Sequence, residues 1–151
     1  MLDNITVREW MTAPVISVTP DTPISTAHQM MKEYGIRRLP VVERDVLVGI
    51  VTLGDVREAS PSDATTLSIW ELNYLWAQLT IEKVMSRKVA TVGPDDFLID
   101  AARIMLEKKV SGLPVVDDHH HVVGIITESD IFRMLVDSRS KAVTPSEQSS
   151  T

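Results

Sequence analysis

The stretch Gly49-Ile50-Val51-Thr52-Leu53-Gly54-Asp55 returns later in the chain as Gly124-Ile125-Ile126-Thr127-Glu128-Ser129-Asp130. Two more blocks repeat in the same order: Trp10 to Asp21 with Val84 to Asp95, and Leu39 to Val42 with Leu113 to Val116. An internal repeat predicts two copies of one structural unit, packed about a pseudo-twofold axis. A unit of about sixty residues buries too little surface to be comfortably stable alone, so we expect the copies to support each other.

The composition argues against several classes of function. The 151 residues include no cysteine, which excludes disulfides, a thiolate nucleophile and cysteine-held metal clusters. The net charge of −6 disfavours binding along a nucleic-acid backbone, which needs a basic face. No apolar run approaches the roughly 20 residues of a membrane span, and no basic, apolar-cored leader opens the chain. We therefore expect a soluble, cytoplasmic protein that binds neither nucleic acid nor membrane.

Hydrophobic periodicity and turn signals predict the order β-α-β-β-α in each copy, an α/β (α+β) fold. The first β runs are Val15 to Val18 and Val89 to Val92. Thr22 is the expected N-cap of the first helix, with Pro23 in its first position and Gly35 as its left-handed end. The stripes that these first helices bury are predicted to be Ile24, Ala27, Met31 and Tyr34, and Leu98, Ala101 and Met105. Strands at Leu39 to Glu43 and Val46 to Val51 follow, and second helices begin at Thr52 and Thr127.

These elements set the expected organisation: repeat 1 over 5–59, a linker over 60–80, repeat 2 over 81–137 and a disordered polar tail over 138–151. Within the linker, Ser68-x-x-Glu71 fits the start of a helix. One face of this helix carries Ile69, Leu72, Trp76 and Leu79, and another carries Trp70, Tyr74 and Ala77. We expect both faces to pack within the chain, the alternative being that a partner subunit covers one of them.

The two Thr-x-x-Asp turns admit a structural and a functional interpretation. As a capping box, the threonine hydroxyl and the aspartate satisfy helix N–H groups, which accounts for both residues without a ligand. The same turn offers a carboxylate and free N–H groups, a combination that can hold a ribose diol beside phosphate. Gly49 and Gly124, lacking side chains, would let such a ligand approach the backbone.

The doubled set of motifs, M-[ST]-x-x-V, P-D, L-P-V-V and G-h-h-T-x-x-D, resembles a tandem of cystathionine-β-synthase (CBS) domains, the Bateman module. The resemblance covers residues 5 to about 137. It implies two pseudo-twofold-related repeats whose clefts bind AMP, ADP, ATP or S-adenosylmethionine as a regulatory ligand, with no catalytic residues and no required cofactor. It also implies a homodimer through the second helices, where Ile131, Phe132, Met134 and Leu135 supply apolar surface.

Carried onto this chain, the resemblance places the ribose on Thr52 and Asp55 in one site and on Thr127 and Asp130 in the other. The adenine slots would be lined by Val15, Ile16, Val89 and Ala90, with Pro40 and Pro114 nearby. Arg37 and Arg38 are the leading phosphate ligands, since arginine binds phosphate bidentately. The alternative is that they are solvent-exposed residues at the start of a strand. Because Glu128 adds negative charge to the second site, we favour the site with Asp55.

Three functions compete. The leading one is a regulatory module that changes conformation on binding an adenosyl ligand and signals to a separate client protein. The second is a ligand-free scaffold that dimerises or docks. An enzyme is the weakest, because we find no phosphate-cradling glycine loop, serine elbow or metalloprotease motif. His119-His120-His121 is interpreted as a solvated turn rather than a metal site, and His28 as a partly exposed helix residue.

Overall fold

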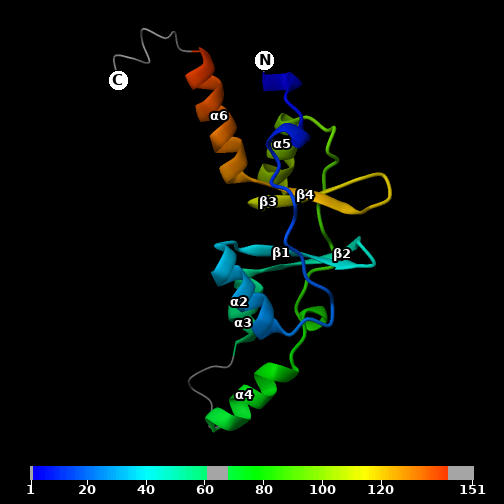
Figure 1. Ribbon diagram of the computed structural model, residues 1–151, viewed down its shortest axis with the longest axis vertical. Coiled ribbons are helices and arrows are strands. Elements are labelled where there is room, and N and C mark those ends of the chain that lie inside the picture. Colours follow the sequence, from blue (N-terminus) through cyan, green and yellow to red (C-terminus); the bar gives the residue numbers. More distant parts are fainter. Residues whose placement is uncertain (1, 61–67, 143–151) are drawn as a thin grey trace. The chain divides into compact units, whose positions relative to one another are not determined.

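The residues that the computed structural model describes, 2–60 and 68–142, divide into two units, each built around one antiparallel hairpin (Figure 1). The first-repeat unit comprises the described residues of 16–89 together with 119–122. The second-repeat unit comprises those of 1–15, 90–118 and 123–151. No helix in the described part of the chain has both the length and the apolar character needed to cross a membrane.

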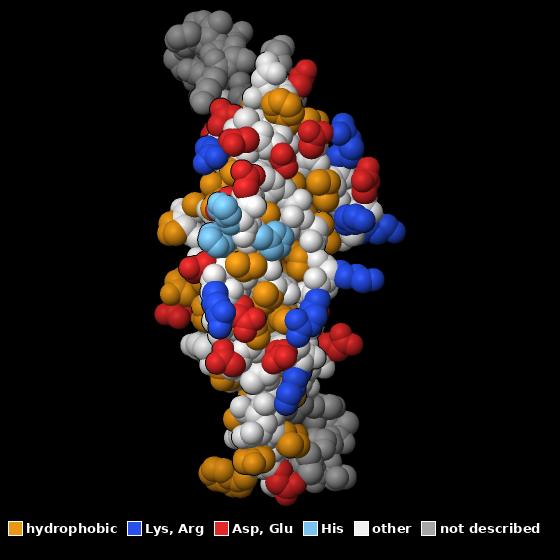
Figure 2. All heavy atoms as spheres, turned by 90° about the vertical axis from the view of Figure 1, so that its right-hand side faces the viewer, with side chains coloured by type: hydrophobic (Ala, Val, Ile, Leu, Met, Phe, Trp, Pro, Cys, Tyr) orange, Lys and Arg blue, Asp and Glu red, His pale blue; other side chains and the backbone are white. Residues whose placement is uncertain are grey.

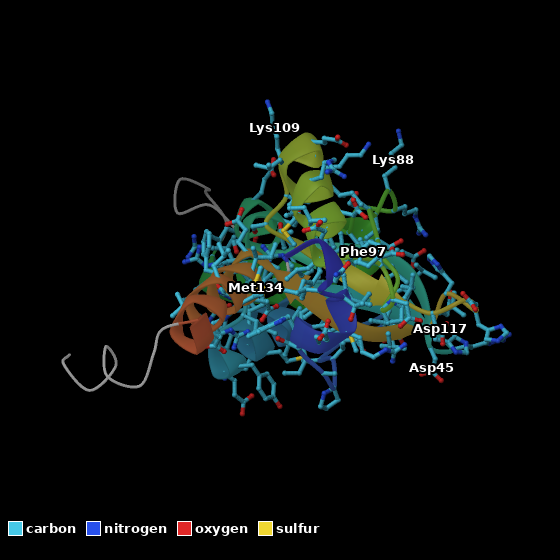
Figure 3. The ribbon with its side chains drawn as sticks, turned by 90° about the horizontal axis from the view of Figure 1, so that it is seen from above. Asp45, Lys88, Phe97, Lys109, Asp117 and Met134 are labelled. Atoms are coloured by element: carbon cyan, nitrogen blue, oxygen red, sulfur yellow. The ribbon has the colours of Figure 1, made fainter. Side chains whose placement is uncertain are left out.

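The first-repeat unit places two helices on one face of its hairpin (Figure 1). Its elements are α2 (Ile24–Tyr34), β1 (Arg38–Glu43), β2 (Val46–Thr52), α3 (Leu53–Ala59), α4 (Ile69–Gln78) and the short 3-10 helix η2 (Ile81–Lys83). The turn between β1 and β2 holds Arg44 and Asp45 at φ 53° and 68°. Two successive positive φ angles suit a two-residue turn whose twist matches that of the strands. Asp45 lies at the tip of this hairpin in Figure 3.

The second-repeat unit repeats this plan. It contains η1 (Leu2–Asn4), α1 (Val7–Trp10), α5 (Leu98–Lys108), β3 (Gly112–Val116), β4 (Val122–Thr127) and α6 (Glu128–Ala142). Lys109 ends α5 at φ 57°, the position that Gly35 occupies at φ 64° in α2. Its side chain extends away from the helix into solvent (Figure 3).

The two cores use equivalent residues, and six of the seven predicted stripe positions are buried. Tyr34 is the exception: it stands in the last turn of α2 and is 54% exposed. The core of the first-repeat unit is Val18, Ile24, Ala27, Met31, Leu39, Val41, Val51, Val56 and Ile81. The core of the second-repeat unit is Val7, Val92, Leu98, Ala101, Met105, Leu113, Val115, Ile126 and Met134.

The segment that opens each repeat packs against elements of the other copy. Val7, in α1, is fully buried in the core of the second-repeat unit and its N–H donates to Asp96 O at 2.9 Å. Ile81, which holds the equivalent place at the start of the second repeat, is fully buried in the first-repeat unit, and its N–H donates to Thr22 O at 2.9 Å. The boundaries of the sequence repeats are therefore not the boundaries of the compact units.

The packing of the segment around Leu79 and Ile81 against the first repeat also explains why Thr22 is not the N-cap of α2. The N-cap is Pro23, and the first helical N–H, on Ile24, donates to Leu79 O at 3.0 Å. The Leu79 carbonyl thus accepts from a helix N–H group that a capping side chain usually satisfies. The Thr22 hydroxyl instead accepts from the N–H of Thr19 at 3.1 Å.

The first β run of each copy is shorter than predicted. Val18 and Val92 each form a single parallel bridge, to Val41 and Val115 respectively. Only one residue of each run therefore pairs with the hairpin. These two residues, Val18 and Val92, are buried in the cores.

The expectation that α4 packs on both faces is wrong. Its Ser68 hydroxyl accepts from Glu71 N–H at 3.2 Å, as the sequence predicted, and Trp76 and Leu79 pack against the core of the first-repeat unit. Trp70, however, is 81% exposed, and Ile69, Tyr74 and Leu75 are also exposed. Hydrophobic side chains lie at the surface around α4, at the lower end of Figure 2.

The C-terminal boundary also differs from the prediction. Helix α6 continues to Ala142, so the tail that we expected to be disordered from Ser138 begins as helix. The remainder of that predicted tail, 143–151, lies outside the described residues.

Candidate functional site

The Thr52 to Asp55 turn forms a reciprocal capping box at the start of α3. Thr52 N–H donates to Asp55 Oδ2 at 2.9 Å, and Asp55 N–H donates to Thr52 Oγ1 at 3.2 Å. Both residues are half-buried. Among the described residues, the Thr52 N–H is the one hydrogen-bond donor to the Asp55 carboxylate. Within the part of the chain that the structure describes, most acceptor sites of the Asp55 carboxylate therefore receive no donor.

The matching turn in the second-repeat unit is more heavily bonded. Asp130 is 1% exposed, and its Oδ2 accepts from Thr127 N–H at 2.9 Å and from the Thr127 hydroxyl at 3.0 Å. Its Oδ1 accepts from the Thr12 hydroxyl at 3.3 Å and from the Arg133 guanidinium. The capping interpretation therefore holds geometrically for both turns, but the two carboxylates differ in how much acceptor capacity remains.

Sequence reasoning did not identify Thr12 and Arg133 as partners of Asp130. The Arg133 contact has a local signal, because positions i and i+3 share a face of a helix. Thr12 lies 118 residues away in sequence, so nothing near Asp130 indicated that contact.

Close packing explains why the repeated motif has glycine at positions 49 and 124. A Cβ on Gly49 would lie 2.7 Å from Met85 Sδ and 2.9 Å from the Ser86 carbonyl oxygen. A Cβ on Gly124 would lie 2.5 Å from Met11 Sδ. The space beside each glycine is thus filled by the methionine of the M-[ST] motif. The suggestion that these glycines admit a ligand to the backbone is therefore wrong.

The predicted phosphate ligands lie beside the first turn. Leu53 N–H, at the start of α3, donates to Arg37 O at 2.7 Å, which brings the Arg37-Arg38 pair next to Thr52 and Asp55. Arg37 is exposed and Arg38 is half-buried. At the same place in the second-repeat unit, Glu128 N–H donates to Ser111 O at 3.0 Å. Along the backbone, the first turn therefore adjoins two arginines, where the second adjoins a serine, a glycine and the acidic Glu128.

The predicted base-lining residues stand where the chain passes from one unit to the other. Val15 and Ala90 belong to the second-repeat unit, and Ile16 and Val89 to the first-repeat unit. All four are half-buried. Pro40 and Pro114 are buried, and their carbonyls accept from Val18 and Val92 N–H at 3.0 and 3.2 Å. The expectation that these residues line clefts between the repeats stays a prediction.

No group of three or more metal-ligating side chains occurs among the described residues. The rings of His119 and His121 lie 6.0 Å apart between centroids, and His120 O accepts from Leu47 N–H at 3.1 Å. Histidine side chains lie at the surface in Figure 2.

His28, on α2, predicts a pH dependence of stability. Burial, followed by the charges of Lys32 and Arg57, lowers the pKa of His28 below 6.5. The unfolded chain therefore binds a proton at higher pH than the folded chain does, and the free energy of unfolding falls as pH drops below about 6.5. We expect urea unfolding at pH 7.5 and pH 5.5 to show a smaller loss of stability on acidification for His28→Gln than for the parent. Equal losses would contradict this assignment.

Comparisons with known proteins show the family. The model of the CBS domain matches residues 7–62 and 81–137. A homoserine O-acetyltransferase from Methanosalsum zhilinae is 34% identical over 139 residues, which is 91% of this chain but 25% of that protein. Uncharacterized protein MJ1225 of Methanocaldococcus jannaschii is 33% identical over 138 residues, 87% of this chain and 47% of that protein. The chain thus spans between a quarter and a half of these curated relatives.

Two solved structures cover nearly the whole chain. The CBS domain pair of protein MJ0100, in complex with 5′-methylthioadenosine and S-adenosyl-L-methionine, has a TM-score of 0.73 and 31% identity, covering 88% of this chain and 97% of that one. CBSX2 in complex with AMP has a TM-score of 0.73 and 28% identity, covering 89% and 98%. With the family model matching both repeats, this chain belongs to the CBS domain family as a tandem pair of such domains.

Proposed function

We propose that this protein is a non-catalytic regulatory module that binds an adenosine-containing ligand, such as AMP, ADP, ATP or S-adenosylmethionine, at its Thr-x-x-Asp turns. In this proposal the ribose lies on Thr52 and Asp55, or on Thr127 and Asp130. The base lies against Val15, Ile16, Val89 and Ala90, close to Pro40 and Pro114, and Arg37 and Arg38 hold phosphate. Binding changes the conformation and signals to a separate client protein.

The observation that carries the proposal is the state of Asp55. It is half-buried, among the described residues it accepts one hydrogen bond on its carboxylate, and it lies next to Arg37 and Arg38. A carboxylate with unused acceptor sites can receive both hydroxyls of a cis-diol, and neighbouring guanidinium groups favour an anionic substituent. The adenosyl ligands of the similar MJ0100 and CBSX2 structures support the same class of ligand.

Ligand-dependent stability tests the proposal. A ligand that binds only the folded state, present at ten times its Kd, raises the free energy of unfolding by about 1.4 kcal/mol. We expect chemical unfolding to show this gain with at least one of AMP, ADP, ATP and S-adenosylmethionine, and none with GMP at the same concentration. If no adenosyl ligand stabilises the protein, the binding proposal fails.

The second candidate is a ligand-free scaffold, favoured by two observations. Capping accounts for the Thr and Asp of both turns, and Trp70 and Tyr74 present an uncovered apolar surface on α4. The unfolding experiment separates the two candidates, because a scaffold gains nothing from adenosyl ligands.

We also propose a homodimer through α6, in cytoplasmic surroundings. Phe132 and Leu135 are 61% and 45% exposed, which supports their part in such a contact. Met134 is buried in the core of the second-repeat unit and Ile131 packs against that core, so these two residues do not belong to the apolar surface that we expected.

A further inference from the structure

The Asp130 carboxylate has no acceptor site to spare. An ionised carboxylate offers about four lone-pair sites. Two donors from Thr127 meet Oδ2, while the Thr12 hydroxyl and the Arg133 guanidinium meet Oδ1. A ribose diol, which needs two acceptor sites, must therefore displace at least one of these partners.

The first repeat lacks the equivalent donors. When the two motifs are aligned so that Asp55 matches Asp130, the counterpart of Arg133 is Glu58, which repels a carboxylate instead of pairing with it. The counterpart of Thr12 in the second M-[ST] motif is Ser86, and its hydroxyl donates to Lys88 O at 3.2 Å instead of to Asp55. Both differences act in the same direction, because each removes a donor from Asp55.

We propose that Arg133 and Thr12 occupy acceptor sites of the Asp130 carboxylate that a ribose diol would need, so that an adenosyl ligand binds at the Asp55 turn first. Binding at Asp130 then requires the displacement of Arg133, whose side chain is 64% exposed and can move into water. Arg133 is thus a specificity-determining residue that sets the order in which the two turns fill. The inference rests on the proposed function, since it concerns the same ribose contact.

Calorimetric titration with adenosine tests the proposal, because adenosine carries the diol but no phosphate that Arg133 could bind. The Asp55→Asn background weakens the first binding event and thereby separates it from the second. In this background, Arg133→Gln is expected to tighten adenosine binding at Asp130 by about fivefold. The reason is that the Arg133 hydrogen bond to the charged Asp130 carboxylate no longer competes with the ribose hydroxyls. The gain is limited because the Arg133 side chain is exposed to water. Thr12→Val should tighten it in the same direction.

Arg103→Gln is the matched control. Arg103 pairs with Asp100 at 2.7 Å, also at i and i+3, on α5 of the same unit, where both side chains are exposed. Its replacement should leave adenosine binding unchanged. If the Asp55-dependent event is present and Arg133→Gln leaves the second event unchanged or weaker, the inference is overturned while the proposed function stands. If neither the parent nor any variant binds adenosine, AMP or S-adenosylmethionine, both are overturned.

Discussion

Replacing Gly49 with alanine is expected to lower the free energy of unfolding by about 3 kcal/mol, at the upper end of the usual range for overpacking. The added Cβ would lie 2.7 Å from Met85 Sδ and 2.9 Å from Ser86 O. The methionine can rotate away, but the Ser86 carbonyl accepts from Ile50 N–H at 2.9 Å and is held there. Urea unfolding followed by circular dichroism measures the loss.

Gly54→Ala is the matched control for this prediction. Gly54 lies in α3 of the same unit, and a Cβ there would lie 3.6 Å from its nearest neighbour, Thr52 Oγ1. Because alanine favours helix over glycine, this variant should gain about 0.5 kcal/mol. If Gly49→Ala were as stable as Gly54→Ala, the packing explanation for the motif glycine would be wrong.

A double-mutant cycle sharpens the test. At Gly124 the close atoms belong to the Met11 side chain, at 2.5 and 3.0 Å, and the nearest backbone atom, Thr12 O, lies at 3.2 Å. Met11→Ala should therefore relieve much of the cost of Gly124→Ala. Met85→Ala should relieve less of the cost of Gly49→Ala, since the Ser86 carbonyl stays. The coupling energy of each pair measures this difference.

The second large effect is expected on ligand binding. Asp55→Asn should weaken binding of the favoured adenosyl ligand by about thirtyfold, which corresponds to about 2 kcal/mol. Asparagine keeps an oxygen that can accept from Thr52 N–H, so the capping box survives in part, but the charge-assisted bonds to a diol are lost. Isothermal titration calorimetry measures the change in Kd, and unfolding measures the accompanying change in stability.

Glu43→Gln is the control for Asp55→Asn. It removes one negative charge from the same unit, at an exposed position at the end of β1. It should change the Kd far less than Asp55→Asn does. Asp130 suits this test less well, because neutralising it leaves the Arg133 guanidinium without its buried counter-charge and thereby mixes stability with binding. Parent-like binding by Asp55→Asn would remove the ribose assignment.

The local structure of this chain was predictable from its sequence to a large extent. Period-3.6 stripes predicted the buried faces of α2 and α5, because a helix can bury such a stripe only against a core. Turn residues placed the hairpins and the starts of α3 and α4, since their capping bonds form between residues three apart. The Thr52 and Thr127 turns were identified in this way, and the Arg37-Arg38 pair was identified by comparing the charges of the two copies.

Tertiary structure alone decided which copy each flanking segment joins and that Thr12 contacts Asp130. The backbone bonds of Val7 to Asp96 and of Ile81 to Thr22 join residues far apart in sequence, and two similar copies offer the segment similar acceptors, so no local pattern could choose between them. The same kind of separation divides Thr12 from Asp130. The repeated sequence thus determines two similar turns, and the nearby Arg133 adds a donor to one of them, whereas the donor from Thr12 comes from a distant part of the chain and only the tertiary structure brings it there.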